Sequence, residues 1–435
     1  MTAKVNALPG QGIRPARARN RVIAAVCLGN ALEFYDFLVY SLLATLMARL
    51  FFPFGDGLTS LMLSFAVFGT GFIMRPLGGL LIGLYADRVG RRSAIRLTLW
   101  MMAIGALMFT VAPTYAQGGL IGPLMVIAAR LLQGFAVGGQ VGTATTILME
   151  NASDGSRAFY CSWQVFSQSL GVFLGALVVL MLSNALSPAA MDSWGWRAVF
   201  GVGILAIPIS EYLRYRLEET LPASSATQPG AAPSEQGLGL LAKYPRQLVT
   251  GVLLVIGVSV PVYITQFYLA NHAIGVLGMP LSSATWAALM SSFPALLLAP
   301  WAGRLSDRIG RRLSIFWPLP ILLVAIYPAF ALLNQNPSLW LLLVTVGLLS
   351  VPLTFSMVGV LATLPELFPP AIRATGLSVS YCIGVALFGG FAQFFATGLI
   401  GLTGSPNAPA WYLAGAVLLC LVGLKLLPGS SSAQP

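Results

Sequence analysis

Twelve long apolar stretches, separated by short charged or turn-forming segments, dominate this sequence. A membrane-spanning helix needs about 20 mainly apolar residues, and within a bilayer every backbone hydrogen bond has to be made inside the protein. Hydrophobic residues make up 57% of the chain and charged residues only 9%, which excludes an ordinary soluble enzyme and intrinsic disorder. The sequence therefore predicts an all-α membrane protein lying in a lipid bilayer.

Composition shifts divide the chain into two sets of six spans. The predicted spans are approximately 21–48, 59–85, 94–113, 120–149, 158–184 and 197–217, then 246–271, 282–303, 313–333, 338–363, 373–400 and 409–427. Residues 218–245 are polar and rich in proline, glycine and small side chains, which predicts a linker between an N-terminal bundle (21–217) and a C-terminal bundle (246–427). Residues 1–20 and 428–435 are the expected tails.

The positive charges are distributed by side of the membrane. The tails and the loops on the same side hold nearly all Lys and Arg residues, whereas the other side carries only Arg49 and Arg197. This bias predicts that both termini and the linker are cytoplasmic, in a multi-pass protein of the cell (inner) membrane. The net charge of +11 therefore reflects the residues that orient the chain in the membrane, and no nucleic-acid partner is predicted.

The two halves repeat one pattern. GLYADRVGRR at 83–92 matches GRLSDRIGRR at 303–312, and the seven-residue spacing of Glu150 and Arg157 recurs in Glu366 and Arg373. Two such pairs at nearly one offset indicate a duplicated six-helix unit. The expected fold is twelve transmembrane helices in two pseudo-symmetric six-helix bundles, with a substrate site between them.

Several strings resemble the major facilitator superfamily. The DRxGRR loop of both halves is its signature, and GNALEFYDF (29–37), FGTGFIMRPLGG (68–79) and RLLQGFAVGG (130–139) are similar to its metabolite:proton symporter branch. FYCSWQVFSQ (159–168) and RLEET (216–220) most resemble citrate and tricarballylate symporters. The resemblance implies a monomeric, cofactor-free transporter that imports a small organic anion, a tri- or dicarboxylate such as citrate, together with protons by alternating access.

Gln140 departs from the citrate-type pattern, in which a glutamate follows the paired small residues of the fourth span. Because an amide cannot titrate, coupling would rest on Glu33 and Asp36, or would be altered or absent. The seventh span also departs, with Asn271 and His272. A same-family transporter of another solute, such as a zwitterionic osmolyte or a shikimate-like acid, an uncoupled facilitator, and more remotely a non-transporting sensor therefore remain alternatives.

Four charged residues interrupt the spans of the first half: Glu33, Asp36, Arg75 and Arg130. A charge at the bilayer centre costs roughly 2.5–3.5 kcal/mol on insertion scales, so such residues are functional candidates. Our hypothesis is that Arg130, with Arg75 as a second candidate, binds a substrate carboxylate by bidentate hydrogen bonds. Glu33 or Asp36 would take up the proton. The alternative is a structural ion-pair cluster that stabilises the first bundle.

Neutral polar side chains at helical spacing complete the predicted substrate site. The candidates are Asn30, Gln133, Gln140, Trp163, Gln164 and Gln168 in the first half, and Tyr263, Gln266 and Tyr381 in the second. A polar seam that joins neighbouring helices is the alternative for each of them.

The repeated loops predict gates. An aspartate at a helix end can cap a neighbouring helix or pair with arginines in one conformation only. The predicted gating residues are Asp87, Arg91, Arg92, Glu150 and Arg157, with Asp307, Arg311, Arg312, Glu366 and Arg373 in the second half.

Other chemistry finds little support. The chain has one histidine, four scattered cysteines and no GxxxxGKS loop, so neither a metal site, an enzyme nor nucleotide-driven transport is predicted. A carrier driven by ion gradients is the function that the sequence favours.

Overall fold

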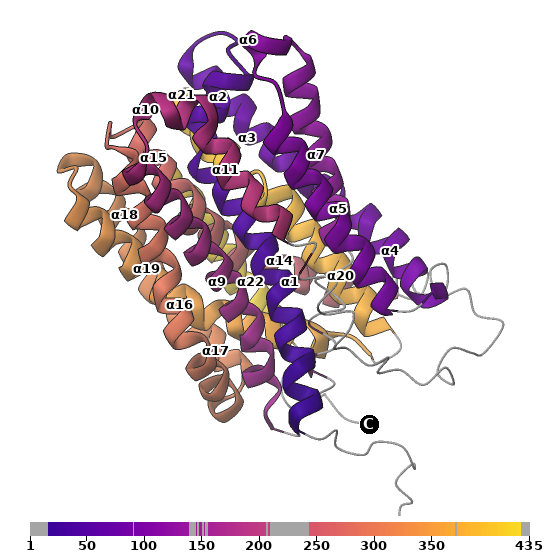
Figure 1. Ribbon diagram of the computed structural model, residues 1–435. Coiled ribbons are helices and arrows are strands. Elements are labelled where there is room, and N and C mark those ends of the chain that lie inside the picture. The colour runs from indigo at the N-terminus through magenta and orange to yellow at the C-terminus, as the bar shows by residue number, and fades with distance from the viewer. Residues whose placement is uncertain are drawn as a thin grey trace, which may run out of the picture.

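The computed structural model describes residues 16–89, 91–138, 145, 148–149, 152, 155–205, 208, 243–369 and 372–427, and nearly all of them are helical (Figure 1). In the first half the longer helices are α1 (Ala16–Leu42), α2 (Ala44–Phe51), α3 (Gly57–Ile73), α4 (Arg75–Val89), α5 (Arg91–Val111), α7 (Ile121–Gly138) and α9 (Arg157–Ala185). Shorter segments are α6 (Tyr115–Gly118), α10 (Pro188–Ala190), η1 (Met191–Gly195), α11 (Trp196–Gly201) and η2 (Val202–Leu205).

The second half has a matching series. Its helices are α14 (Pro245–Tyr263), η4 (Ile264–Tyr268), α15 (Leu269–Gly275), α16 (Leu281–Ile309), α17 (Arg311–Phe316), α18 (Pro318–Gln335), α19 (Leu339–Thr363), η5 (Leu364–Leu367), α20 (Arg373–Gly384), η7 (Val385–Gly389), α21 (Ala392–Thr403) and α22 (Ala408–Leu426). Each predicted span is helical over most of its described residues, with exceptions such as Leu43 and 112–113. Residues 218–242 of the predicted linker, 1–15 of the predicted N-terminal tail and the C-terminal tail 428–435 lie outside the described residues, whereas 16–20 begin helix α1.

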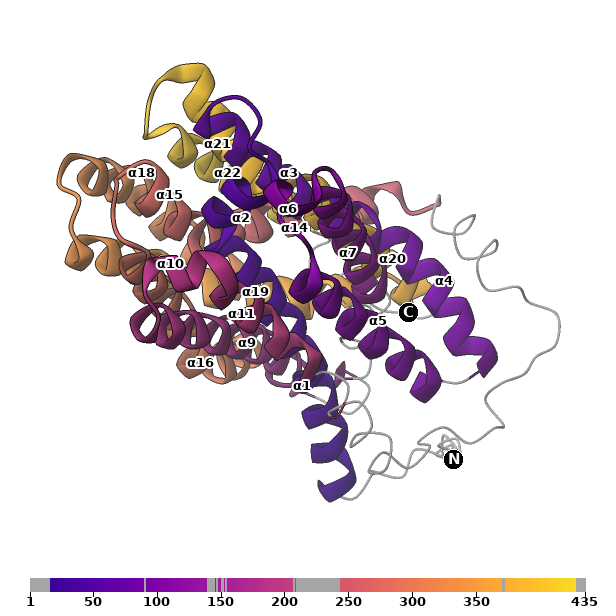
Figure 2. The same cartoon turned by 45° about the horizontal axis from the view of Figure 1, so that its top comes forward.

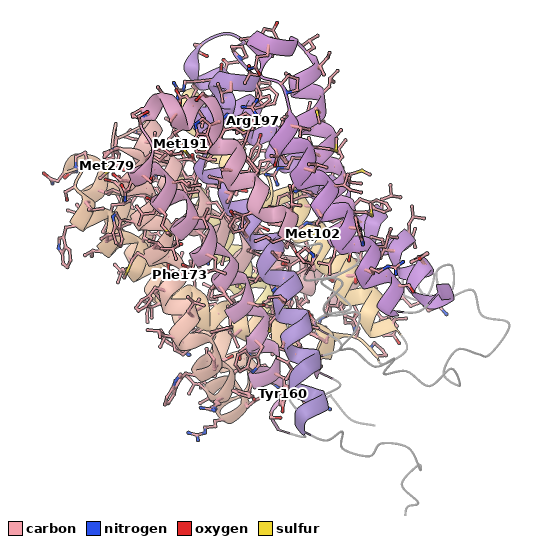
Figure 3. The ribbon with its side chains drawn as sticks, in the orientation of Figure 1. Met102, Tyr160, Phe173, Met191, Arg197 and Met279 are labelled. Atoms are coloured by element: carbon pink, nitrogen blue, oxygen red, sulfur yellow. The ribbon has the colours of Figure 1, made fainter. Side chains whose placement is uncertain are left out.

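Membrane-spanning helices account for most of this series. Among the described residues nine helices are long and apolar enough to cross a bilayer, and ten if α1 and α2, bent by 64° at Leu43, form one span. Large apolar side chains project from the bundle along its length (Figure 3), with Leu402 87% and Val324 76% exposed. Such a surface suits lipid rather than water.

The two halves meet along a seam parallel to the helices (Figures 1 and 2). Helix α9 packs against α1 of its own half and along α16 of the other, while α3 packs against α21. We call the lower end of the seam in Figure 1 the arginine end, because it carries the Arg311 loop, and the upper end the opposite end. The start of α1 lies at the arginine end (Figure 1). The end of α22 lies beside the start of α14, where Arg246 donates a hydrogen bond to the main-chain oxygen of Leu426 at 3.3 Å.

Candidate transport site

The first acid–arginine group lies at the seam. Arg75 Nη2 donates to Glu33 Oε1 at 3.2 Å, and both residues are buried. The Arg75 guanidinium stacks over the Phe72 ring, with its carbon 4.1 Å from the ring centroid. Its Nε and Nη1 and the second oxygen of Glu33 have no hydrogen-bond partner among the described residues. This ion pair therefore has unused capacity to bind a ligand.

Two tyrosines of the second half cover this pair. Tyr263 and Tyr381 lie within electrostatic range of Arg75, and the Tyr263 ring meets the Phe72 ring edge-on at 5.4 Å between centroids. The Tyr263 hydroxyl is buried without a hydrogen-bond partner. Residues predicted separately in the two halves thus come together around Arg75.

The second acid–arginine group lies inside the first half and is joined through an amide. Gln133 Nε2 donates to Asp36 Oδ2 at 3.0 Å, and Arg130 Nη1 donates to Gln133 Oε1 at 3.1 Å. The Arg130 guanidinium sits between the rings of Tyr40 and Phe109, 4.2 and 4.7 Å from their centroids. Arg130 is therefore enclosed by first-half helices, and it reaches the Asp36 carboxylate only through Gln133.

The polar side chains of α9 fall into two groups with different surroundings. Asn30 donates to the main-chain oxygen of Gln164 at 3.0 Å and to Ser167 Oγ at 2.8 Å, and Thr145 donates to Gln164 Oε1 at 2.6 Å. Trp163 is half-buried and packs edge-on against Phe166. These contacts lie within the first half, as expected if polar side chains join neighbouring helices there. Asn30, Gln164 and Trp163 stay predictions as substrate ligands.

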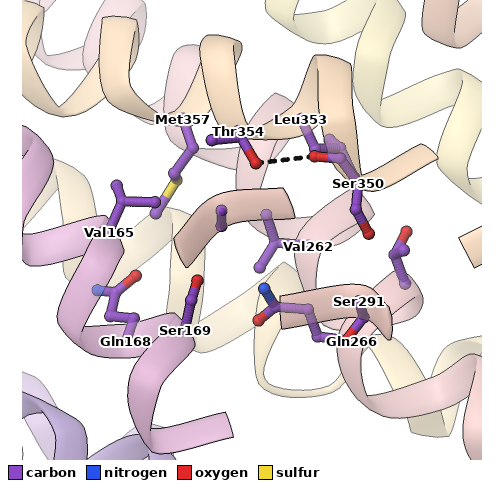
Figure 4. A pocket seen from close by; sticks show the side chains of 12 residues that line it. Val165, Gln168, Ser169, Val262, Gln266, Ser291, Ser350, Leu353, Thr354 and Met357 are labelled. Carbon is purple, nitrogen blue, oxygen red and sulfur yellow. Dashed lines mark hydrogen bonds between the residues drawn. The ribbon is translucent and has the colours of Figure 1, made fainter. Parts of the chain in front are cut away.

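Gln168 points instead into a cavity at the seam (Figure 4). The cavity has a volume of about 20 Å³, room for about one water molecule, and its lining comes from α9, the α14–η4 segment, α16 and α19. Its polar members are Gln168, Ser169, Thr265, Gln266, Ser291, Ser350 and Thr354, and no charged side chain lines it. The amide nitrogen of Gln168 and the hydroxyls of Thr265 and Ser350 are buried without hydrogen-bond partners. These groups can accept hydrogen bonds from, or donate them to, an uncharged part of a ligand.

The sequence had indicated Gln168 and Gln266 but not the hydroxyl residues around them. Serine and threonine in membrane helices usually bond to a carbonyl of their own helix, as Thr354 does with Ser350 at 2.8 Å. Helical spacing in the sequence could not distinguish Thr265 and Ser350, whose hydroxyls face the cavity, from residues of that kind. Thr265 and Gln266 lie in the π-helical turn η4 and line the cavity, and no repeat or motif shows which side chains of such a turn face inward.

At the arginine end the halves are joined by Asp307. Its two carboxylate oxygens accept hydrogen bonds from the backbone N–H groups of Ala158 and Phe159, both at 2.9 Å. Arg311 donates to Asp307 at 2.9 Å and to Glu366 at 3.3 Å. The carboxylate thus caps the first turn of α9 across the seam, which is the arrangement expected for a closed gate.

Only some predicted gating residues can be placed. Arg157 begins α9, and Arg312 is exposed beside Arg311. The other predicted gating side chains lie outside the described set: Asp87, Arg91, Arg92, Glu150 and Arg373. Gln140, a predicted substrate ligand, also lies outside it. Within the described set no group of His, Cys, Asp and Glu is arranged to hold a metal ion.

Buried charge is unequal between the halves. The buried Asp, Glu and Arg residues of the described chain are Glu33, Asp36, Arg75 and Arg130, all in the first half. Two helical halves, buried charges beside a seam, and a closure at one end are the features of a membrane transporter.

Comparison with known proteins identifies the family. The model of the family described as "Sugar (and other) transporter" matches residues 22–221 and 210–432. The chain therefore belongs to this family of the major facilitator superfamily. The D-xylose-proton symporter structure has a TM-score of 0.77 at 19% identity, covering 95% of this chain and 99% of that chain, and shows the fold of two six-helix bundles.

Curated relatives are transporters of small solutes. A citrate-proton symporter of Klebsiella pneumoniae is 34% identical over 93% of this chain and 91% of its own. The alpha-ketoglutarate permease of Escherichia coli is 33% identical over 94% of each chain. A proline/betaine transporter of the same species is 32% identical over 93% of this chain and 82% of its own. The chain is thus a multi-pass membrane transporter of this family and not an enzyme.

Proposed function

We propose that this protein is a symporter that imports a small di- or tricarboxylate together with protons. The observation that carries the proposal is the pair of buried acid–arginine groups, Glu33 with Arg75 and Asp36 with Arg130. With both acids ionised the four residues are neutral in sum. Protonation of either acid leaves one positive charge in a low-dielectric site, which favours an anion. Proton and anion would therefore bind together.

Within this site Arg75 is the side chain that we propose contacts the substrate. It lies at the seam, and two of its three nitrogens are unpartnered. A substrate carboxylate could bind there bidentately and displace Glu33, which is then free to take a proton. Arg130 is enclosed between Tyr40 and Phe109, so we propose that it acts through Gln133 on Asp36.

The uncharged cavity, once widened by movement of the halves, would hold the rest of the substrate. Gln168 and Gln266 face it from opposite halves, together with hydroxyls of the second half (Figure 4). A ligand that bridges Arg75 and this cavity would contact both halves, as alternating access requires. By the positive-inside rule we place the arginine end in the cytoplasm, so the Asp307 contact would close the cytoplasmic side.

A zwitterionic solute is the second candidate. With both acids ionised the four buried charges sum to zero, which suits a ligand with no net charge, and the proline/betaine transporter resembles this chain over a similar length. An uncoupled facilitator also remains, because Gln140 offers no titratable group where citrate-type relatives have a glutamate.

Reconstituted transport separates these functions. The purified protein in liposomes is given an inward proton gradient and offered citrate, tricarballylate, alpha-ketoglutarate, shikimate, proline and betaine in turn. We expect gradient-dependent uptake of a carboxylate that is lost in Glu33→Gln and in Asp36→Asn. Asp192→Asn is the matched control, because it removes an exposed carboxylate that pairs with Arg49 at 3.2 Å. Uptake that ignores the gradient contradicts coupling, and uptake of betaine alone contradicts the carboxylate assignment.

A further inference from the structure

Three neutral polar residues meet at the seam near its opposite end, away from the charged groups. They are Ser41 in α1, Asn271 in α15 and Gln393 in α21, with exposed fractions of 0%, 2% and 0%. They come from both halves and from three different helices. Three polar side chains buried together need to satisfy one another, because no water replaces a missing partner.

Their hydrogen bonds cross the seam. Asn271 Nδ2 donates to the main-chain oxygen of Ser41 at 2.8 Å, and Ser41 Oγ donates to Gln393 Oε1 at 2.9 Å. Asn271 Nδ2 also lies 3.1 Å from Gln393 Oε1 and 3.0 Å from the main-chain oxygen of Phe267. A single amide group thus collects acceptors from both halves.

The Ser41 carbonyl is available because α1 ends there. Helix α1 stops at Leu42, and α2 continues at an angle of 64° after Leu43. The last turn of a helix has carbonyl oxygens without a partner in that helix, and a buried oxygen of this kind needs another donor. Asn271 supplies that donor from the other half. The bend in the first span and the contact across the seam therefore depend on each other.

Aromatic rings surround these bonds without fixing their geometry. Phe65 meets Tyr268 across the seam at 6.5 Å between centroids, and Phe68 meets Phe267 at 6.3 Å. Apolar contacts of this kind tolerate sliding, whereas hydrogen bonds require one position. In addition Asn271 Oδ1 and Gln393 Nε2 are buried without partners.

We propose that Ser41, Asn271 and Gln393 form a clasp that keeps the opposite end closed, and that breaking the clasp opens the cavity to that side. Opening would uncover the Ser41 carbonyl and both amides to water, which can then satisfy them. The clasp consists of hydrogen bonds between uncharged groups, in contrast to the charged Asp307 contact at the arginine end. It concerns the movement of the halves and does not rest on the identity of the solute or on proton coupling.

The test measures access to the cavity from the side that the clasp closes. Thr265 lines the cavity and is 2% exposed, so Thr265→Cys provides a buried thiol. Right-side-out membrane vesicles are treated with a membrane-impermeant thiol reagent, and labelling is read for each cysteine-containing peptide by mass spectrometry. Asn271→Leu keeps the branched shape of the side chain but removes the donor. We expect it to speed labelling about tenfold or more, and Gln393→Leu to act in the same direction.

The matched control is Asn334→Leu. Asn334 also holds a hydrogen-bonded amide, 2.7 Å from His272 Nε2 and 2.7 Å from Asn407, but all these partners belong to the second half. Labelling in this variant should stay within about twofold of the parent. Equal acceleration in Asn334→Leu and Asn271→Leu would overturn the clasp, as would unchanged labelling in both clasp variants. If a leucine variant fails to fold, Ser41→Ala removes the hydroxyl bond to Gln393 with a smaller change and keeps the bond from Asn271 to the Ser41 main-chain oxygen, so it should speed labelling in the same direction but by less.

Discussion

Asp307→Asn should open the arginine end, and the size of the effect follows from three contacts. The carboxylate accepts two backbone N–H groups of α9 at 2.9 Å and one Arg311 nitrogen at 2.9 Å, and its side chain is 8% exposed. An amide has only one acceptor oxygen, so one N–H of α9 loses its partner and faces an NH2 group. Hydrogen bonds to charged groups are worth about 1.5–3 kcal/mol, and a charge at a helix N-terminus adds up to about 2 kcal/mol.

These terms suggest a loss of about 2–4 kcal/mol from the closed arrangement. At about 1.4 kcal/mol for each factor of ten, the balance between open and closed arginine ends should move roughly 30- to 700-fold. The substitution leaves every positive charge in place, so the orientation set by the arginines does not change.

Native cysteines report this opening directly. Cys161 is fully buried beneath the Asp307 contact, in a cluster with Ala158 and Ala362 from the two halves. Cys420 is buried within the second half, where it contacts Gly257. In detergent-solubilised protein we expect Asp307→Asn to speed alkylation of Cys161 at least tenfold. The rate for Cys420 in the same molecules should not change.

Glu366→Gln is the matched control for this prediction. It also replaces an acid partner of Arg311, at 3.3 Å, but its side chain is 31% exposed and both residues belong to the second half. An exposed pair of this kind contributes about 0–1 kcal/mol. Equal effects of Glu366→Gln and Asp307→Asn would refute the idea that capping α9 across the seam closes this end, and so would an unchanged Cys161 rate.

Two further predictions concern stability. Gly134→Ala should lower the thermal midpoint in detergent by an amount equivalent to about 1–3 kcal/mol, because an added Cβ would overlap the Gly71 carbonyl where α7 crosses α3. Gly29→Ala is the control, because there is open space where its Cβ would lie. An equal loss of stability in Gly29→Ala would contradict the packing explanation. Asp56 caps α3, and hydrogen bonds from the side chain and backbone N–H of Thr59 lower the pKa of its carboxyl from 3.8. The ionised Asp56 cap therefore stabilises the start of α3 above about pH 4, and this stabilisation is lost as the pH falls below that. Proteolysis of the loop before α3 should increase at low pH in the parent but stay flat in Asp56→Asn.

The spans were predictable from the sequence because hydropathy alone determines them, but their interruptions were not. The first span was predicted as 21–48, and the structure divides it at Leu43, where no proline or glycine signals a break. The partner that stabilises the break is Asn271, far away in the sequence. In the seventh span Pro261 removes a backbone donor just before the π-helical turn η4, so a signal existed there, but it does not specify which side chains turn inward.

In the candidate transport site, too, the sequence predicts the residues but not their partners. Helical spacing places Glu33 and Asp36 on one side of α1, which agrees with the structure, but it cannot say which arginine each one meets. Only the packing of α4 and α7 around α1 assigns Arg75 to Glu33 and Arg130, through Gln133, to Asp36. The choice of neighbour is tertiary information, because a helical pattern specifies a face and not what covers it.

The position of these groups on one helix bears on how the proposed steps are linked. Glu33, Asp36 and Ser41 all lie in α1, and Asp36 and Ser41 are five residues, or about 7.5 Å, apart along its axis. On the proposed mechanism the ion pair binds substrate, the acids bind the proton, and the end of the helix carries the clasp. A small tilt or rotation of α1 would then alter all three together, because a helix moves as a rigid body. On this mechanism coupling requires no long chain of intermediates, because the groups involved share one helix.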